Sequence, residues 1–514
     1  MRISRRNLLG LATAAAGSLA AWAGGVQAHT RRPSRRYQPS SALRYDDEGN
    51  RLHWEKSYSG GPLNVRPLPP GRPGKDYQPV VVPTGYTLPF KIVDGVKVFH
   101  LILEEVEHHF DTGLKATCWA YNNHVNSTVI EAVEGERIRI YVTNRLRVPS
   151  SVHWHGIYLP NGMDGVSGLT QPHIKPGETF KYEWTLRQYG TYMYHSHHDT
   201  MTQEGMGLTG MFVIHPRHPK PEYHVDRDFV IMLSEWAIVA GTSRPNTLEM
   251  SDFNILTMNG KCFPSTAPWV GKTGDKIRIR LGNLSQMDHH PIHLHGYHFR
   301  ITATDGADIP LSAQWPETSV LVSVGQTRNI EFIADAPGDW AVHCHMTHHM
   351  MNQMGHEFPN MVGVEPGDMD QRIGSLLPGY MTMGHEGMAM SRMAEPMPMP
   401  VNSIPMKSRM GPFNEYLTAG GMLTLVKVRD RLQSYDQDPG WYQHPPNTVA
   451  MPASTQELAR DRIDVHASTA RAIDVVPNTP APRLTRVDPV PPAMKAHRAR
   501  YRWSSRQDGG PYQQ

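Results

Sequence analysis

Hydrophobic and polar residues alternate along many short segments of this chain. The alternation is clearest at residues 136–146, ERIRIYVTNRL, and 179–186, TFKYEWTL, and residues 91–110 form a longer apolar-rich stretch. A period of two places successive side chains on opposite faces of a strand. Glycine and proline interrupt the segments at short intervals, which favours strands and turns over helices. The pattern predicts an all-β unit that ends with residues 210–216.

The same pattern recurs after a proline-rich linker at residues 215–224, HPRHPKPEYH. The two halves also echo each other in sequence. ERIRIYVTNRL precedes HWHG as DKIRIRLGNL precedes HPIHLHG, and TYMYHSH occupies the place that DWAVHCH occupies later. We therefore expect two tandem β-sandwich domains, residues 79–216 and 217–366.

The N-terminal residues 1–28 carry Arg5 and Arg6, an apolar run and small residues before Ala28. These features predict a twin-arginine export signal and a periplasmic protein. A membrane anchor is the alternative, but the apolar run of residues 8–23 is rich in alanine and glycine. It is also shorter than the roughly 20 residues that a spanning helix needs.

The segments outside the two domains have biased compositions. Residues 29–78 are rich in arginine, proline and glycine, and we expect an irregular arm. Residues 367–514 are expected to be a largely disordered tail, rich first in methionine and then in proline and arginine. Nine methionines lie in residues 381–410. Within the tail, residues 420–430 have a strand-like core, which we expect to pack on the body of the protein.

Composition narrows the classes of function. The net charge of +3 over 514 residues is too small to indicate binding to nucleic acid. The 29 histidines and 28 methionines are residue types that bind transition metals. With three cysteines there is no disulfide framework. Cys118 and Cys262 are open to two interpretations, a disulfide or two buried free thiols.

The segment 340–354, WAVHCHMTHHMMNQM, has the strongest chemical signal in the chain. A thiolate, two imidazoles and a distant thioether are the ligands of an electron-transferring blue copper. Cys344, His349 and Met354 supply three of these ligands, and the second imidazole is expected from residues 289–298, HHPIHLHGYH. Side chains alternate along a strand, so His343 and His345 point away from the face of Cys344. They are therefore available to a second metal centre.

Two further histidine clusters precede this segment, HWHG at residues 153–156 and HSHH at residues 195–198. In each, a His-x-His pair on a strand directs both imidazoles to one side. One such pair alone is more often structural or a weak metal site. Taken in order, the motifs HWHG, HSH, HPxHLHG and HCHxxxHxxxxM are similar to those of the multicopper oxidases, over residues 80–366.

This resemblance implies a fold of two tandem cupredoxin-like Greek-key β-sandwiches with irregular N- and C-terminal extensions. About 90 residues separate His197 from His290, which leaves no room for a middle domain. The chain therefore resembles the two-domain laccases. In that type the trinuclear copper site lies between domain 1 of one subunit and domain 2 of the next, which implies a homotrimer.

The resemblance also implies a set of ligands for four coppers, one type 1, one type 2 and two type 3. The type 1 copper takes His290, Cys344 and His349, with Met354 on the axis. The trinuclear centre takes His153, His155, His195, His197, His293, His295, His343 and His345, with His153 and His293 on the type 2 copper. Cys344 passes electrons on, and Asp164 orients water and delivers protons. Thr347 stands where some members of the family carry an acid.

The expected activity is one-electron oxidation of a phenolic or metal-ion donor, Cu(I) or Mn(II), coupled to four-electron reduction of O2 to water. Neither nucleic acid nor a membrane is an expected partner. The methionine segment favours copper handling, and a flexible linker is its other interpretation. One alternative is a periplasmic copper-binding or tolerance protein with incidental oxidase activity. Copper nitrite reductase is disfavoured, because that family carries its blue-copper cysteine in the first domain and lacks the eight histidines.

Overall fold

The computed structural model describes residues 66–111, 114–238, 242–352, 411–415, 417 and 419–466. The predicted export signal, most of the N-terminal arm, Met354 and the methionine-rich segment lie outside the described residues. The chain divides into two compact units, Met1–Gln443 and His444–Gln514. In the second unit, helix α6 (Thr455–Arg460) begins at a capping box formed by Ser454 and Glu457.

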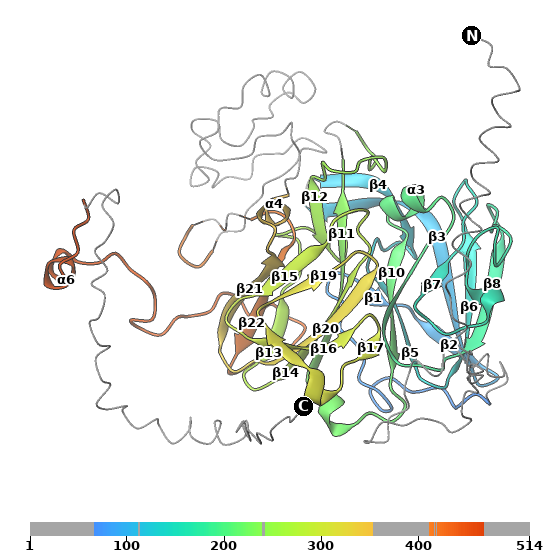
Figure 1. Ribbon diagram of the computed structural model, residues 1–514, viewed down its shortest axis with the longest axis horizontal. Coiled ribbons are helices and arrows are strands. Elements are labelled where there is room, and N and C mark those ends of the chain that lie inside the picture. The colour runs from blue at the N-terminus through green and yellow to red at the C-terminus, as the bar shows by residue number, and fades with distance from the viewer. Residues whose placement is uncertain are drawn as a thin grey trace, which may run out of the picture. The chain divides into compact units, whose positions relative to one another are not determined.

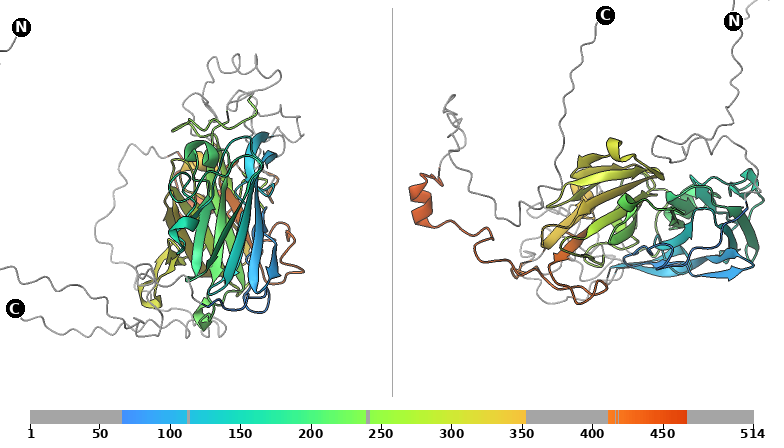
Figure 2. Two further views of the ribbon diagram at one scale, coloured as in Figure 1. Left: turned by 90° about the vertical axis from the view of Figure 1, so that its right-hand side faces the viewer. Right: turned by 90° about the horizontal axis from the view of Figure 1, so that it is seen from below.

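The first unit contains two β-sandwiches side by side, as Figure 1 and the right-hand view of Figure 2 show. The first sandwich has one sheet in the order β1-β5-β10-β9-β7 and another in the order β2-β3-β6-β8, with β4 beside β3. Its strands are β1 (Tyr86–Thr87), β2 (Phe90–Val93), β3 (Val96–Asp111), β4 (Leu114–Tyr121), β5 (Thr128–Val133), β6 (Arg137–Asn144), β7 (His153–His155), β8 (Thr179–Thr185), β9 (Gly190–His195) and β10 (Thr209–His215).

The second sandwich repeats the arrangement with a sheet in the order β12-β11-β14-β20-β16-β17, β18 beside β16, and a sheet in the order β13-β22-β21-β15-β19. Its strands are β11 (Arg227–Trp236), β12 (Ile255–Met258), β13 (Trp269–Lys272), β14 (Lys276–Asn283), β15 (His290–Leu294), β16 (Phe299–Thr304), β17 (Ala307–Asp308), β18 (Trp315–Glu317), β19 (Ser319–Val322), β20 (Gln326–Ile333), β21 (Gly338–Cys344) and β22 (Leu423–Arg429).

The helical segments that the structure describes in the first unit are short and lie in the connections between strands. They are η1 (Asn161–Met163), α3 (Thr200–Gly205), η2 (Pro221–Tyr223), η3 (Leu311–Ala313) and α4 (Thr347–Met350). No helix among the described residues is long and apolar enough to cross a lipid bilayer.

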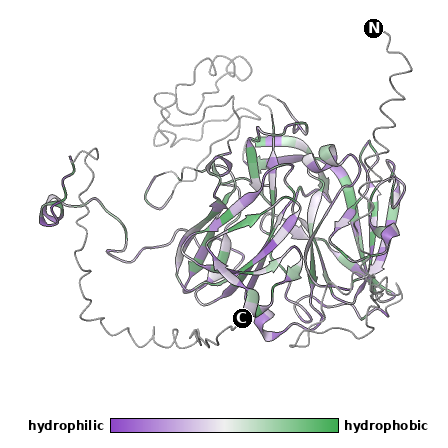
Figure 3. Ribbon diagram, in the orientation of Figure 1, coloured by the Kyte–Doolittle hydropathy of each residue, from purple (hydrophilic) through white to green (hydrophobic). Residues whose placement is uncertain are grey.

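The alternation in sequence builds the cores. Along β6, Ile138, Ile140 and Val142 are buried, and the residues between them are half-buried. Figure 3 shows hydrophobic and hydrophilic residues interleaved along such strands. In the first core, the buried ring of Trp154 lies 5.3 Å from that of Trp184, centroid to centroid. Trp154 therefore serves packing, because burial of a large aromatic ring stabilises a core strongly.

The two sandwiches pack against each other through apolar and polar contacts. A buried cluster joins Met193 and Met211 of the first sandwich to Val230 and Met232 of the second. Beside it, the Thr191 hydroxyl donates to Asn329 at 2.9 Å and accepts from the Arg280 guanidinium at 2.7 Å. These contacts fix how the edges of the two sandwiches that carry the histidine motifs lie relative to each other.

The predicted all-β class and the pair of cupredoxin-like sandwiches are confirmed. Strand β22 comes from the segment that the sequence assigned to the tail, and it lies between β13 and β21 inside the second sandwich. The sequence predicted that this strand packs on the rest of the protein, but it did not predict that the strand lies between two others within a sheet. Cys118 and Cys262 are both buried free thiols, so the disulfide interpretation does not apply.

A buried ion pair between Lys97 and Glu136 gives a stability prediction. Their charged atoms lie 2.9 Å apart, with both side chains fully buried. Removing one partner leaves the other charge buried without compensation, which costs about 3–5 kcal/mol. We expect Lys97→Met to lower the free energy of unfolding by that amount in urea denaturation. Lys115→Met is the matched control, because its pair with Glu107 is exposed and contributes about 0–1 kcal/mol. Equal losses in the two variants would contradict the prediction.

Candidate metal centres

The pairing of β15 with β21 brings two of the predicted motifs together. Ile292 lies opposite Cys344, and His293 lies opposite His343. Because side chains alternate along both strands, Cys344 faces the core of the sandwich and His343 faces outward. Cys344 is fully buried and His343 is half-buried, consistent with the opposite faces that the sequence predicted. One strand therefore serves two sites on its opposite faces.

On the inner face, three predicted ligands of the type 1 copper converge. The Nδ1 atoms of His290 and His349 are 3.1 Å apart. The Cys344 Sγ lies 3.9 Å from the first and 3.4 Å from the second. Metal–nitrogen bonds of about 2.0–2.1 Å and metal–sulfur bonds of about 2.3 Å put ligands of one ion roughly 3–4 Å apart. The two-histidine, one-thiol donor set therefore fits a trigonal blue copper.

In His290 and His349, the ring nitrogen that points away from the three converging ligand atoms lies near an oxygen atom. The His290 Nε2 lies 2.6 Å from the Ser285 hydroxyl, and the His349 Nε2 lies 3.4 Å from an Asp288 carboxylate oxygen. Glu235 lies behind Asp288 and accepts its backbone N–H at 3.1 Å. Such contacts fix which ring nitrogen is left for a metal. Nothing in the spacing of the sequence motifs predicted Ser285, Asp288 or Glu235 at this place.

Burial sets the protonation of the type 1 group. It lowers the pKa of His290 to about 3, with the neighbouring His349 adding to the effect, so this imidazole is neutral at neutral pH. Burial raises the pKa of the Cys344 thiol to about 12. A metal ion must therefore displace the thiol proton when it binds.

The segment that leads into β22 forms one wall of this group. The Met422 N–H donates to the His349 carbonyl and the Cys344 N–H donates to the Met422 carbonyl, both at 3.0 Å. A Cβ on Gly421 would lie 2.1 Å from the His349 carbonyl oxygen and 2.8 Å from the Asn352 nitrogen. Only glycine fits this close approach. Gly421 and Met422 thus hold the end of β21, which carries Cys344, and the short helix α4 after it, which carries His349.

On the outer face, four imidazoles of the second sandwich gather at the surface. The Nε2 atoms of His295 and His343 are 3.1 Å apart. The ring of His293 lies 4.8 Å from that of His295, and 5.7 and 5.5 Å from those of His343 and His345. His295 and His345 are exposed. We call these four residues the domain 2 quartet.

The first sandwich carries an equivalent domain 1 quartet. Strand β7 pairs with β9 so that His153 lies opposite His195, the counterpart of His293 opposite His343. The His155 Nδ1 lies 3.4 Å from the His195 Nε2. The ring of His197 lies 5.5 Å from that of His153. The repeat that the sequence predicted is therefore a repeat of the sites as well.

In each quartet backbone carbonyls hold two of the four imidazoles through their Nδ1 atoms. These contacts are His153 with Asp164 at 2.8 Å, His195 with Ser196 at 2.9 Å, His293 with Thr318 at 2.6 Å and His343 with Cys344 at 2.8 Å. A carbonyl accepts only, so each of these four Nδ1 atoms carries the proton and the Nε2 of the same ring presents a lone pair. The quartets are therefore arranged as ligands for metal ions.

Two carboxylates lie against the domain 1 quartet. Asp164 was predicted from the sequence, and its carboxylate lies 3.5 Å from the His153 Nδ1. Glu204 was not predicted, and its Oε1 lies 2.7 Å from the His195 Nδ1. Burial acts to lower the pKa of His195, but the hydrogen bond and charge of Glu204 outweigh it and raise that pKa. A carboxylate on a helix of six residues gives no periodic signal that sequence reasoning can detect.

The two quartets are separate within one chain. All eight histidines are among the described residues, and every ring contact between them joins members of the same quartet. Each quartet by itself provides half of the imidazoles that the predicted trinuclear centre needs.

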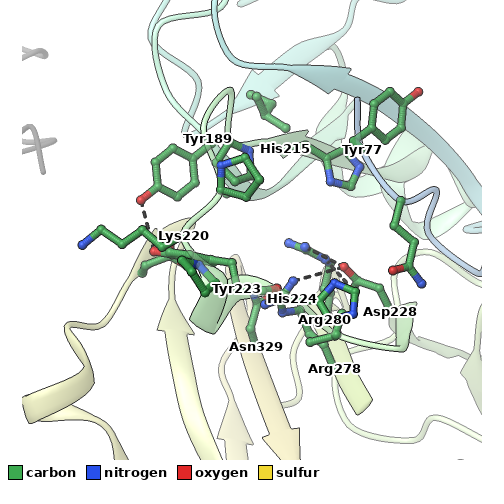
Figure 4. Close-up of a pocket in the computed structure, with 18 of the residues that line it drawn as sticks. Tyr77, Tyr189, His215, Lys220, Tyr223, His224, Asp228, Arg278, Arg280 and Asn329 are labelled. Carbon is green, nitrogen blue, oxygen red and sulfur yellow. Dashed lines mark hydrogen bonds and ion pairs between the residues drawn. The ribbon is translucent and has the colours of Figure 1, made fainter. Parts of the chain in front are cut away.

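A cavity of about 290 Å³ lies elsewhere, between the linker and both sandwiches (Figure 4). Tyr77 and Tyr189 line it, with His215 stacked on Tyr77. The Arg280 guanidinium in its wall donates twice to Asp228, each time at 2.8 Å. Arg280 and Asp228 are thus engaged with each other, and none of the lining residues belongs to the predicted ligand set.

Two family models match the chain, and both describe multicopper oxidases. They cover residues 103–219 and 240–363, which contain every predicted ligand motif. The chain belongs to the multicopper oxidase family. This membership confirms the resemblance that the four motifs carried.

This chain covers about two fifths of the length of several curated relatives that it matches. Copper resistance protein A of Escherichia coli is 30% identical over 38% of this chain and 40% of its own length. Laccase-1 of Botryotinia fuckeliana is 34% identical over 42% of this chain and 39% of its own. The solved blue copper oxidase of Nitrosomonas europaea aligns with a TM-score of 0.47 and 26% identity, over 64% of this chain and 85% of that one.

The type 1 group gives a prediction about pH. Because the Cys344 thiol has a pKa of about 12, its proton competes with copper throughout the neutral range. We expect the apparent copper affinity of this group to rise about tenfold per pH unit near neutrality. Chelator competition at several pH values, followed by the blue absorption, measures it. Cys344→Ser should abolish the blue colour and Cys118→Ser should keep it. A pH-independent affinity would contradict the assignment of Cys344 as a ligand.

Proposed function

We propose that this chain is a copper oxidase that passes electrons singly from a donor to O2 and reduces O2 to water. The observation that carries the proposal is the use of one strand, β21, by two sites. Cys344 faces a buried three-ligand group, and its neighbours His343 and His345 face a surface quartet. Four electrons and four protons convert each O2 to two waters. Four coppers per functional unit, one type 1, one type 2 and two type 3, supply that capacity when bound.

We assign the type 1 ligands to His290, Cys344 and His349, with Met354 on the axis. The trinuclear ligands are the domain 1 quartet, His153, His155, His195 and His197, and the domain 2 quartet, His293, His295, His343 and His345. His153 and His293 hold the type 2 copper. The convergence of ring nitrogens at 3.1–3.4 Å within both quartets supports this assignment.

The route for electrons runs from Cys344 to the domain 2 quartet. One peptide bond joins Cys344 to each of its histidine neighbours. In addition, the His343 Nδ1–H donates to the Cys344 carbonyl at 2.8 Å. This hydrogen bond adds a route from Cys344 to one imidazole that is shorter than the covalent path through the backbone. Oxidation of the donor at the type 1 group and reduction of O2 at the quartets would then take place at separate sites.

Asp164 is the residue to which we assign proton delivery. Its backbone carbonyl orients His153 and its half-buried carboxylate stays within 3.5 Å of that imidazole. A carboxylate at this position can hold water and pass a proton to O2 at the site. Thr347, three residues after Cys344, has no acidic group, so Asp164 acts from the domain 1 side.

We further propose a homotrimer in which the quartets of different subunits face each other. A head-to-tail contact between unlike surfaces closes into a ring. The separation of the quartets within a chain supports this assembly, because a complete trinuclear centre needs both. The exposure of His295 and His345 also supports it, since ligands in a finished site are shielded from water.

Two observations favour Cu(I) as the electron donor. Copper resistance protein A is among the matching relatives, and thioethers such as those of residues 381–410 prefer Cu(I). We therefore propose Cu(I) as the donor and export by the twin-arginine signal of residues 1–28 to the periplasm. A protein that mainly binds copper for tolerance is the second candidate, favoured by the same methionine segment.

Subunit mixing tests the location of the trinuclear centre. One variant carries His153→Ala and His155→Ala, and the other carries His343→Ala and His345→Ala. Each alone should be inactive. Co-expressed in equal amounts, they should regain about a quarter of wild-type O2 uptake, because random assembly pairs two intact quartets at a quarter of the contacts. A mixture that stays inactive, although both variants form trimers, would place the centre within one subunit.

Oxygen uptake by the copper-loaded protein tests the reaction and the donor. We expect faster uptake with Cu(I) than with a methoxyphenol at matched concentrations. Faster uptake with the phenol would make the protein a laccase. Absence of uptake with either donor, despite full copper loading, would contradict the oxidase proposal. Deleting residues 381–410 then tests the second candidate. If the protein mainly binds copper, the deletion lowers the amount of copper bound and leaves turnover of the phenol unchanged.

A further inference from the structure

Helix α3 brings a carboxylate to the back of one imidazole of the domain 1 quartet. The Glu204 Oε1 lies 2.7 Å from the His195 Nδ1, and their side chains are only 15% and 9% exposed. The opposite nitrogen of the same ring, Nε2, faces the His155 Nδ1 at 3.4 Å. Glu204 therefore touches His195 on the side away from the converging ligand atoms.

The surroundings of α3 hold Glu204 in this position. Its neighbour Gln203 accepts the hydroxyl protons of Ser150 and Ser196, both at 2.6 Å, and donates to the Pro149 carbonyl at 2.8 Å. A Cβ on Gly205 would lie 2.5 Å from the side-chain nitrogen of Gln286. The helix is thus fastened on one side by buried hydrogen bonds and packed closely against the second sandwich on the other.

No other imidazole of the two quartets has a comparable partner among the described residues. His293 and His343 have only neutral oxygen atoms at Nδ1, and the carboxylate nearest His153 is 3.5 Å away. The Nδ1–H of His195 is shared between the Ser196 carbonyl and Glu204. A hydrogen bond to a charged acceptor is roughly twice as strong as one to a neutral acceptor. The ring of His195 is therefore held more firmly than the others.

We propose that Glu204 is the positioning residue for His195 and, through it, for the coupled copper pair. Its carboxylate keeps the proton on Nδ1, holds the Nε2 lone pair toward the metal and makes that nitrogen a stronger donor. Carboxylate–histidine–metal arrangements of this kind raise ligand basicity and metal affinity. The inference rests on the ligand role proposed above for His195.

Three variants test the inference through metal retention. Glu204→Ala removes the acceptor, and Glu204→Gln keeps an oxygen acceptor without the charge. Glu222→Gln is the matched control, a glutamate on the short helix η2 for whose carboxylate the described structure gives no bond. We expect Glu204→Ala to lose copper from the trinuclear centre to a chelator about 10–100-fold more readily than wild type. Copper loss from Glu204→Gln should lie between that of Glu204→Ala and that of wild type. Copper loss from Glu222→Gln should equal that of wild type.

Electron paramagnetic resonance separates a positioning role from a merely structural one. A coupled copper pair gives no signal, so its disturbance in Glu204→Ala should add a Cu(II) signal while the blue absorption of the Cys344 group remains. Loss of the blue absorption or of the trimer in that variant would mean that Glu204 supports the fold, and would overturn the inference. Equal copper retention in all variants would overturn it too. A wild-type protein without a coupled pair would instead refute the proposed function.

Discussion

The structure depends on the register between β15 and β21. Pairing Ile292 with Cys344 and His293 with His343 decides which side chains enter the core and which face outward. A shift by one residue would exchange the two faces and destroy both sites, because the side-chain period of a strand is two. The buried core around Cys344 specifies this register. Packing and metal binding therefore constrain the same strand.

The duplication explains why the quartets resemble each other and why they remain apart. Each sandwich pairs a His-x-His strand with a second His-x-His strand, so each builds its own group of four imidazoles. The apolar cluster around Met193 and Met232 and the polar contacts of Thr191 fix the two sandwiches against each other. Because this packing keeps the two quartets apart, the proposed trinuclear centre would take one quartet from each of two copies of the chain. Oligomerisation and copper binding would then be thermodynamically linked.

Much of the fold and the metal chemistry was predictable because it depends on local patterns. Alternation in residues 136–146 and 179–186 predicted strands that the structure contains as β6 and β8. The spacing of HCHxxxH predicted that Cys344 and His349 meet. Contacts between separate structural elements were not predictable. Glu204 reaches His195 from a separate helix, and Asp288 reaches His349 across 61 positions of sequence.

The sequence by itself determined the class of fold, the duplication and the family, because periodicity and ligand spacing are local properties of the chain. Only the tertiary structure decided that Gly421 and Met422 wall the type 1 group, and that β22 lies inside the second sandwich. It also decided that the two quartets do not meet within one chain. These features arise from packing between segments far apart in sequence, and no local pattern encodes which distant backbone will occupy a given place.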